Sequence, residues 1–182
     1  MKQRPEPTVN LRPDEVRRGD TGYARTDGLM GLLIRVGEWL KWRDGEHNHA
    51  FTVVTEGDSW ESIEIVQATL RGVVKSSMAE LLSSAIRVEL LHNPDHVDPS
   101  MVAWFAERQV GDPYGLLSIL CNALDILTPD WFIAFRRRGT WICSALAAES
   151  MRFGGLYVDW DDIYIPTPNR VHRAHLEALG AR

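Results

Sequence analysis

Hydrophobic and polar positions alternate through the middle of the chain, which is the pattern of half-buried β-strands. Residues 49–55 and 60–68 are rich in β-branched and aromatic side chains, and the polar residues 56–59 between them predict a hairpin turn. Shorter alternating runs at 71–75 and 85–90 predict further strands. The centre of the chain therefore predicts a run of antiparallel strands.

On both sides of this region, apolar residues recur three or four positions apart, which predicts helices. The predicted helices cover residues 29–40, 78–84, 100–110, 115–127, 171–179 and the small-residue stretch that follows Trp141 and ends at Gly154-Gly155; short extended segments are predicted at 21–25, 157–158 and 163–165. Strands in the middle with helices on both sides predict the α+β class.

The length of 182 residues predicts one domain. Residues 1–13 are polar and rich in proline, so we expect a loose N-terminal arm followed by a single domain over 14–182. The segment from Met1 to Pro7 has no apolar core after its charges, so it does not resemble a signal peptide. We expect synthesis in a cytoplasm, with export by another route left open.

Composition and charge argue against several classes of protein. A net charge of −5 argues against a nucleic-acid binder, whose surface would be basic. No apolar run approaches the length of a membrane span. The two cysteines, Cys121 and Cys143, do not make a disulfide framework, and both are expected to be reduced. Nothing in the sequence indicates a cofactor or fixes the oligomeric state.

Cys143 is the candidate for chemistry because it lies at the start of a predicted helix. The unpaired N–H groups there carry partial positive charge, which lowers a thiol pKa and favours the thiolate. The alternative is a small buried hydrophobe, a common role of free cysteine. Cys121 falls in an apolar helical run and is interpreted as core.

His49 and Gln67 are the candidate partners of the thiol. If the turn lies at 56–59, residue 49 faces 66 or 67 across the hairpin, so Gln67 can bond the second ring nitrogen of His49. Each could alternatively be an ordinary hydrogen-bonded strand residue. Glu64 competes for the third position, although three residues along a strand place it on the opposite face from Gln67.

Several segments resemble, in order, a known family. They are Gly19-Asp20-Thr21-Gly22-Tyr23, Asn48-His49-Ala50-Phe51-Thr52-Val53-Val54, Ile65-Val66-Gln67-Ala68 with Gly72-Val73, Gly111-Asp112-Pro113-Tyr114, Trp141-Ile142-Cys143-Ser144 and Ile165-Pro166-Thr167-Pro168. Together they resemble the permuted branch of the papain-like NlpC/P60 superfamily, which includes the YiiX-like and lecithin:retinol acyltransferase-like proteins. The resemblance covers residues 19–168. Where relatives often have glutamate, histidine or asparagine as the third residue, this chain has glutamine.

The resemblance implies a circularly permuted papain-like fold, with a central antiparallel sheet packed by helices and the nucleophile at a helix N-terminus. It implies Cys143 as nucleophile, His49 as base and Gln67 as orienting residue, and we add Tyr23 as a possible oxyanion donor beside the Cys143 N–H. The implied activity is a cysteine hydrolase that cleaves an amide through a thioester, with peptidoglycan peptides as the substrate class. Two alternatives are an acyltransferase or thioesterase acting on lipid or acyl esters, and a catalytically silent binding or assembly protein with the same fold.

A zinc site is the remaining possibility from the sequence. His47 and His49 form an H-x-H pair, and His92 and His96 add a second pair. No H-E-x-x-H motif accompanies them, and Pro94 prevents a helical pairing of His92 with His96. The sequence therefore predicts no metal site.

Overall fold

The computed structural model describes residues 6–27, 46–115, 139–156 and 167–181. The helix predicted over 29–40, all but the first residue of the helix predicted over 115–127, the extended segments predicted at 157–158 and 163–165, and Cys121 lie outside the described residues.

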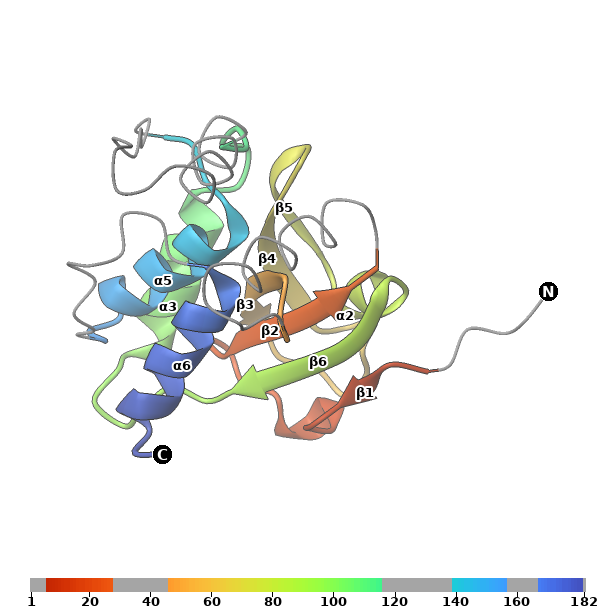
Figure 1. Cartoon of the computed structure of the whole chain (residues 1–182), viewed down its shortest axis with the longest axis horizontal. Helices are drawn as coiled ribbons and strands as arrows, with labels where there is room; N and C mark the ends of the chain where they lie inside the picture. Colours follow the sequence, from red (N-terminus) through yellow and green to blue (C-terminus); the bar gives the residue numbers. More distant parts are fainter. Residues whose placement is uncertain (1–5, 28–45, 116–138, 157–166, 182) are drawn as a thin grey trace, which may run out of the picture.

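A six-stranded sheet forms the centre of the molecule (Figure 1). Its strands are β1 (Thr8–Val9), β2 (Thr21–Thr26), β3 (His49–Thr55), β4 (Glu64–Thr69), β5 (Gly72–Ser77) and β6 (Ala85–Leu91). They lie in the order β1-β6-β2-β3-β4-β5, and every neighbouring pair is antiparallel except β1 with β6, which is parallel. The sheet is therefore mixed rather than wholly antiparallel, and the α+β class is confirmed.

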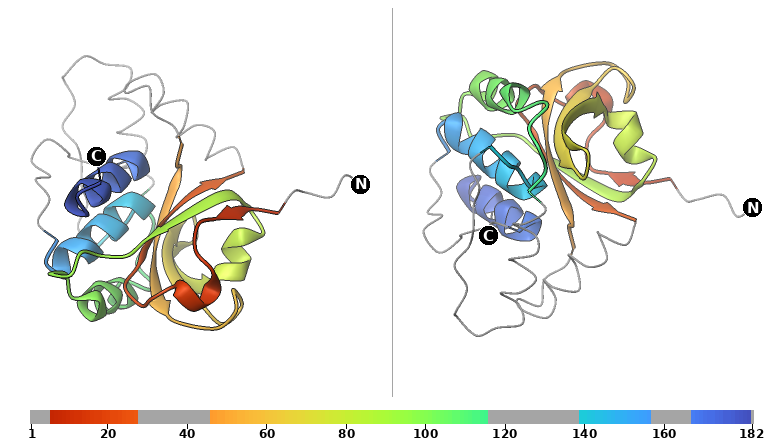
Figure 2. Two further views of the ribbon diagram at one scale, coloured as in Figure 1. Left: turned by 90° about the horizontal axis from the view of Figure 1, so that it is seen from below. Right: turned by 90° about the horizontal axis from the view of Figure 1, so that it is seen from above.

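Helices cover both faces of this sheet (Figure 2). They are the 3-10 helix η1 (Pro13–Glu15), α2 (Met78–Leu82), α3 (Pro99–Arg108), α5 (Cys143–Phe153) and α6 (Pro168–Ala178). Helices α3, α5 and α6 lie together on one side, and α2 lies on the other. Among the described residues, none forms a helix with the length and apolar character needed to cross a membrane.

Alternation along the strands supplies a separate hydrophobic core to each face. Phe51 and Val53 of β3 pack with Ile65 and Met78 in the core on the α2 side. Ala50 and Val54, which point the other way, join the cores formed with α3, α5 and α6. Because both faces are covered, β3 and β4 are buried almost throughout.

The expected loose arm is ordered where the structure describes it. Thr8 and Val9 pair with Arg87 and Val88 of β6. The Asn10 side chain continues this pairing, because its amide donates to the Leu90 carbonyl (2.9 Å) and its oxygen accepts from the Leu90 N–H (2.8 Å). A two-residue strand leaves almost no periodicity in the sequence, so prediction from pattern missed it.

The central hairpin also differs from its predicted register. The returning strand β4 begins at Glu64 rather than near residue 60, and Thr52 lies opposite Val66. The Ser62 hydroxyl donates to the Ser59 carbonyl (2.9 Å) and accepts from the Ser59 N–H (3.1 Å), which holds a longer turn than the four residues expected. Side-chain hydrogen bonds of this kind are not visible in hydrophobic periodicity.

Candidate active site

Cys143 is the first residue of α5, as the sequence predicts for a helix-start thiol. It carries a free thiol and is 5% exposed. The preceding residue, Ile142, has no side-chain oxygen and makes no side-chain cap for the first-turn N–H groups. The helix start therefore keeps backbone donors and the positive end of the helix dipole beside the sulfur. Ala147 and Ala148 let α5 pack closely on the sheet.

The Cys143 thiol lies beside His49, the first residue of β3, and each of the two groups shifts the pKa of the other. Burial alone would raise the pKa of the thiol, but the hydrogen bond and positive charge of His49, with the backbone N–H groups of Ala50 and Ser144, lower that pKa below its ordinary value. Burial alone would likewise lower the pKa of His49, whereas the negative charge of Cys143 and the bonds to Cys143 and Gln67 raise it. Both directions favour a thiolate–imidazolium pair.

Gln67 holds the far side of the imidazole. His49 Nε2 donates to Gln67 Oε1 at 2.7 Å, which leaves Nδ1 as the ring nitrogen available to the sulfur. The Gln67 amide nitrogen donates to the Ser76 hydroxyl at 2.9 Å, and this bond fixes which end of the amide faces His49. Extending the observed Thr52–Val66 pairing by one residue puts Gln67 opposite Phe51, so Gln67 is a diagonal neighbour of His49 on the same face.

Tyr114 is a site residue that the sequence analysis did not select. It forms a parallel bridge with Trp141, and the Trp141 indole N–H donates to Asp112 Oδ2 at 2.9 Å. These contacts fix the segment that precedes α5. Burial and the nearby charge of Cys143 raise the pKa of the Tyr114 hydroxyl, so it stays a neutral hydrogen-bond donor. Its position in Gly111-Asp112-Pro113-Tyr114 was the available signal.

These side chains line one cleft, whose volume is about 860 Å³. Its lining includes Cys143, His49, Gln67 and Tyr114, together with Ser76 of β5 and Leu81 of α2. The cleft also carries charges of both signs, Lys75 and Arg71 against Glu80 and Asp27. A thiol, an imidazole, an amide and a phenol thus border a single space that a substrate can enter.

Two other predicted site residues lie elsewhere. Tyr23 is fully buried, its hydroxyl is bonded to His175 Nδ1 at 3.2 Å, and it does not line the cleft. Glu64 accepts from the Thr55 hydroxyl (2.9 Å) and pairs with Lys75 (2.8 Å). Neither residue therefore lies beside the thiol. Tyr23 is directed into the hydrophobic core between the sheet and α5 by the alternation of β2.

The four histidines considered for zinc do not come together. His49 belongs to the thiol, His92 Nδ1 donates to the Asp20 carboxylate at 3.0 Å, and His96 is exposed. His47 lies near Glu89 and His172 instead. The H-x-H pair is split because His47 precedes β3, which begins at His49.

Comparison with known proteins identifies no family for this chain. No protein-family model matches the chain, and no curated protein matches it with significant similarity.

Proposed function

We propose that this protein is a cysteine-dependent hydrolase that cleaves an amide through a thioester intermediate. The observation that carries the proposal is the chain of contacts from Cys143, at the start of α5, to His49 and on to Gln67. A nucleophile, a base within hydrogen-bond reach and a group that orients the base are what covalent thiol catalysis requires. The order of sheet histidine and later helix cysteine is what a permuted papain-like, NlpC/P60-type fold would have, and that resemblance makes peptidoglycan peptides the proposed substrate class.

The mechanism follows from these groups. The Cys143 thiolate attacks the acyl carbon, and the new S–C bond produces a tetrahedral oxyanion beside the N–H groups at the start of α5. His49 gives its proton to the leaving nitrogen as the C–N bond breaks, which leaves a thioester on Cys143. His49 then takes a proton from water, whose oxygen attacks the thioester. Cleavage of the S–C bond releases the acid and restores the thiolate.

Trapping of the acyl-enzyme tests the proposal without knowledge of the natural substrate. Incubation with p-nitrophenyl acetate should place an acetyl group on the Cys143 peptide, detected by mass spectrometry. Iodoacetamide should alkylate the same peptide at pH values well below the usual thiol pKa of about 8.5, because His49 and the helix start lower the pKa of Cys143. His49→Ala should move that alkylation profile to higher pH.

Cys143→Ser is the control, since it should remove both adducts from this peptide while leaving the melting temperature nearly unchanged. A catalytically silent binding protein predicts a different outcome. Its Cys143 would show an ordinary thiol alkylation profile, unaffected by His49→Ala, and would form no acetyl adduct. That result would overturn the proposal.

A further inference from the structure

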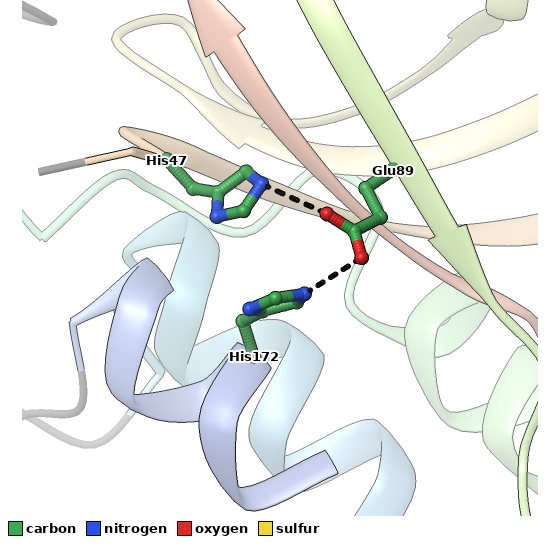
Figure 3. A group of neighbouring side chains, drawn as sticks. All are labelled: His47, Glu89 and His172. Atoms are coloured by element: carbon green, nitrogen blue, oxygen red, sulfur yellow. Dashed lines mark ion pairs between the residues drawn. The ribbon is translucent and has the colours of Figure 1, made fainter. Parts of the chain in front are cut away.

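A second group of chemically active side chains lies outside the cleft (Figure 3). His47 precedes β3, Glu89 lies in β6 and His172 lies in α6, and the three side chains converge although they come from distant parts of the sequence. His47 Nε2 is 3.6 Å from Glu89 Oε2, and His172 Nε2 is 3.2 Å from Glu89 Oε1. One candidate ligand atom from each residue lies within 4.8 Å of the other two.

The cluster is withdrawn from solvent yet poorly satisfied by the protein. The His47 side chain is 1% exposed, and those of His172 and Glu89 are 15% and 19% exposed. Despite their closeness to Glu89, the Nε2 atoms of His47 and His172 are buried and make no hydrogen bond of regular geometry. A buried polar atom without a partner costs about 1–3 kcal/mol, so two that point at one carboxylate need an explanation.

A metal ion between the three groups provides that explanation. Ligand atoms at about 2.0–2.1 Å around tetrahedral zinc are separated by about 3.3 Å. The observed nitrogen–oxygen distances, 3.6 Å to Glu89 Oε2 and 3.2 Å to Glu89 Oε1, are near this value. Two imidazoles and one carboxylate are a donor set that zinc uses with one position left for water. Calcium and magnesium prefer oxygen ligands and suit this set less well.

The surroundings hold two of the ligands in place. The Asn169 side chain accepts from the His47 N–H (2.9 Å) and donates to the His47 carbonyl (3.0 Å), which ties the start of β3 to α6. The Tyr23 ring packs edge-on against His172, with 4.8 Å between ring centroids. Arg87 opposes the metal, because its guanidinium lies 3.3 Å from Glu89 Oε2, but that side chain is half-exposed and can turn to solvent.

We propose that His47, Glu89 and His172 bind one Zn²⁺ ion, which joins α6 to β6 and to the start of β3. The site is separate from the proposed thiol chemistry and does not depend on it. Its expected role is to stabilise the packing of α6 on the sheet, since an ion that binds only the folded state raises stability.

Calorimetric titration with Zn²⁺ tests the site on the full chain after treatment with a chelator. Zinc also binds thiolates, so the measurement uses a Cys143→Ser background. One ion per chain should bind, and Zn²⁺ should raise the melting temperature. His172→Ala should weaken binding by more than about 100-fold, because loss of even an outer-shell partner costs about 10- to 100-fold. His96→Ala, which removes an exposed histidine, is the matched control and should bind as the background does.

Cobalt substitution keeps the test decisive if His172→Ala does not fold. Co²⁺ in the same background should give a visible spectrum without thiolate-to-cobalt charge transfer, and His172→Cys should introduce that band by supplying a sulfur ligand. The proposal is overturned if zinc affinity is equal in the background and His172→Ala, if His96→Ala abolishes binding, or if His172→Cys leaves the cobalt spectrum unchanged.

Discussion

Gln67 is a neutral partner for the proposed catalytic histidine. Its amide oxygen accepts from His49 Nε2 and its amide nitrogen is held by Ser76, so the ring orientation depends on one side chain. An amide orients the imidazole but does not stabilise imidazolium as a carboxylate would. At this site, the imidazolium is therefore stabilised mainly by the negative charge of Cys143. The thiolate is stabilised by His49 and by the backbone N–H groups of Ala50 and Ser144.

Loss of this orienting group should appear in turnover rather than in binding. We expect Gln67→Ala to lower kcat by about 10- to 100-fold with a smaller change in KM, because the variant disturbs a supporting contact and leaves the nucleophile in place. Steady-state kinetics on any substrate that turns over would measure it. Glu64→Ala is the matched control on the same strand, since Glu64 bonds Thr55 and Lys75, and it should keep near-normal kcat. If Glu64→Ala abolished turnover while Gln67→Ala kept a normal kcat, Glu64 rather than Gln67 would be the orienting residue.

At the residue scale, sequence reasoning brought Cys143, His49 and Gln67 together through an incorrect register. The predicted pairing placed residue 49 opposite 66 or 67, whereas the structure pairs Thr52 with Val66. The observed register puts residue 49 opposite 69, a shift of two from the predicted pairing with 67, and an even shift preserves which face a side chain occupies, so Gln67 still reaches His49. The placement of Tyr23 depended on the packing of α6, where His175 binds its hydroxyl, and no local pattern reports such a contact.

The Phe51 ring of β3 lies against Gly22, its cross-strand partner in β2. Gly22 lies directly opposite Phe51, and a Cβ atom added at Gly22 would lie 2.0 Å from the Phe51 ring. The ring is 1% exposed and packed in the core on the α2 side, so it has little room to move. The glycine in the segment Thr21-Gly22-Tyr23 is therefore explained by aromatic packing across the sheet.

We expect Gly22→Ala to lower the free energy of unfolding by about 1–3 kcal/mol, the usual cost of overpacking. Urea denaturation would measure the change. The control is a double-mutant cycle with Phe51→Leu, because a smaller side chain opposite should relieve the clash and reduce the cost of Gly22→Ala. The same cost in both backgrounds would show that Phe51 is not its cause.

At the element scale, the pattern predicted where most described helices and strands lie but not every boundary. Helix α6 begins at Pro168, three residues before the predicted start, because the Thr167 hydroxyl accepts from the Arg170 N–H and Pro168 occupies the first turn. Both signals were present in the sequence. The strand β1 could not be found in this way, because its order comes from pairing with a strand about 80 residues later.

Across the whole molecule, His175 connects three elements. Its Nε2–H donates to the His92 carbonyl (3.1 Å), so Nδ1 accepts from the Tyr23 hydroxyl, and α6 is thereby joined to β2 and to the segment after β6. Burial lowers the pKa of His175 to about 4. The imidazole is therefore held in its neutral form at ordinary pH.

This buried neutral histidine should make the protein sensitive to acid. In the unfolded chain the pKa is about 6.5, so the unfolded state binds more protons between pH 6.5 and about 4, and stability falls as pH falls through that window. The loss is roughly 3 kcal/mol. Urea denaturation at a series of pH values, with a chelator present, would measure it.

His175→Gln should flatten this pH dependence, because the amide can make both hydrogen bonds and does not titrate. His96→Gln is the matched control, since His96 is exposed and should leave the profile unchanged. Burial raises the pKa of Asp20, so this carboxyl makes stability rise as pH falls, opposite to the effect of His175. Asp20 is present in all three proteins, so its contribution does not alter the comparison. An unchanged slope in His175→Gln would contradict the prediction.

The order of elements along the chain has a consequence for biosynthesis. All the described strands are translated by Leu91, whereas the described helices α3, α5 and α6, which cover one face of the sheet, follow over roughly the next 90 residues. At about 5–20 residues per second, that interval lasts on the order of 4 to 20 s. A sheet that formed in this interval would expose apolar residues such as Val54 and Val66, which pack against α3 and α5 in the folded protein. His49 is likewise synthesised well before Cys143, its partner in the proposed site.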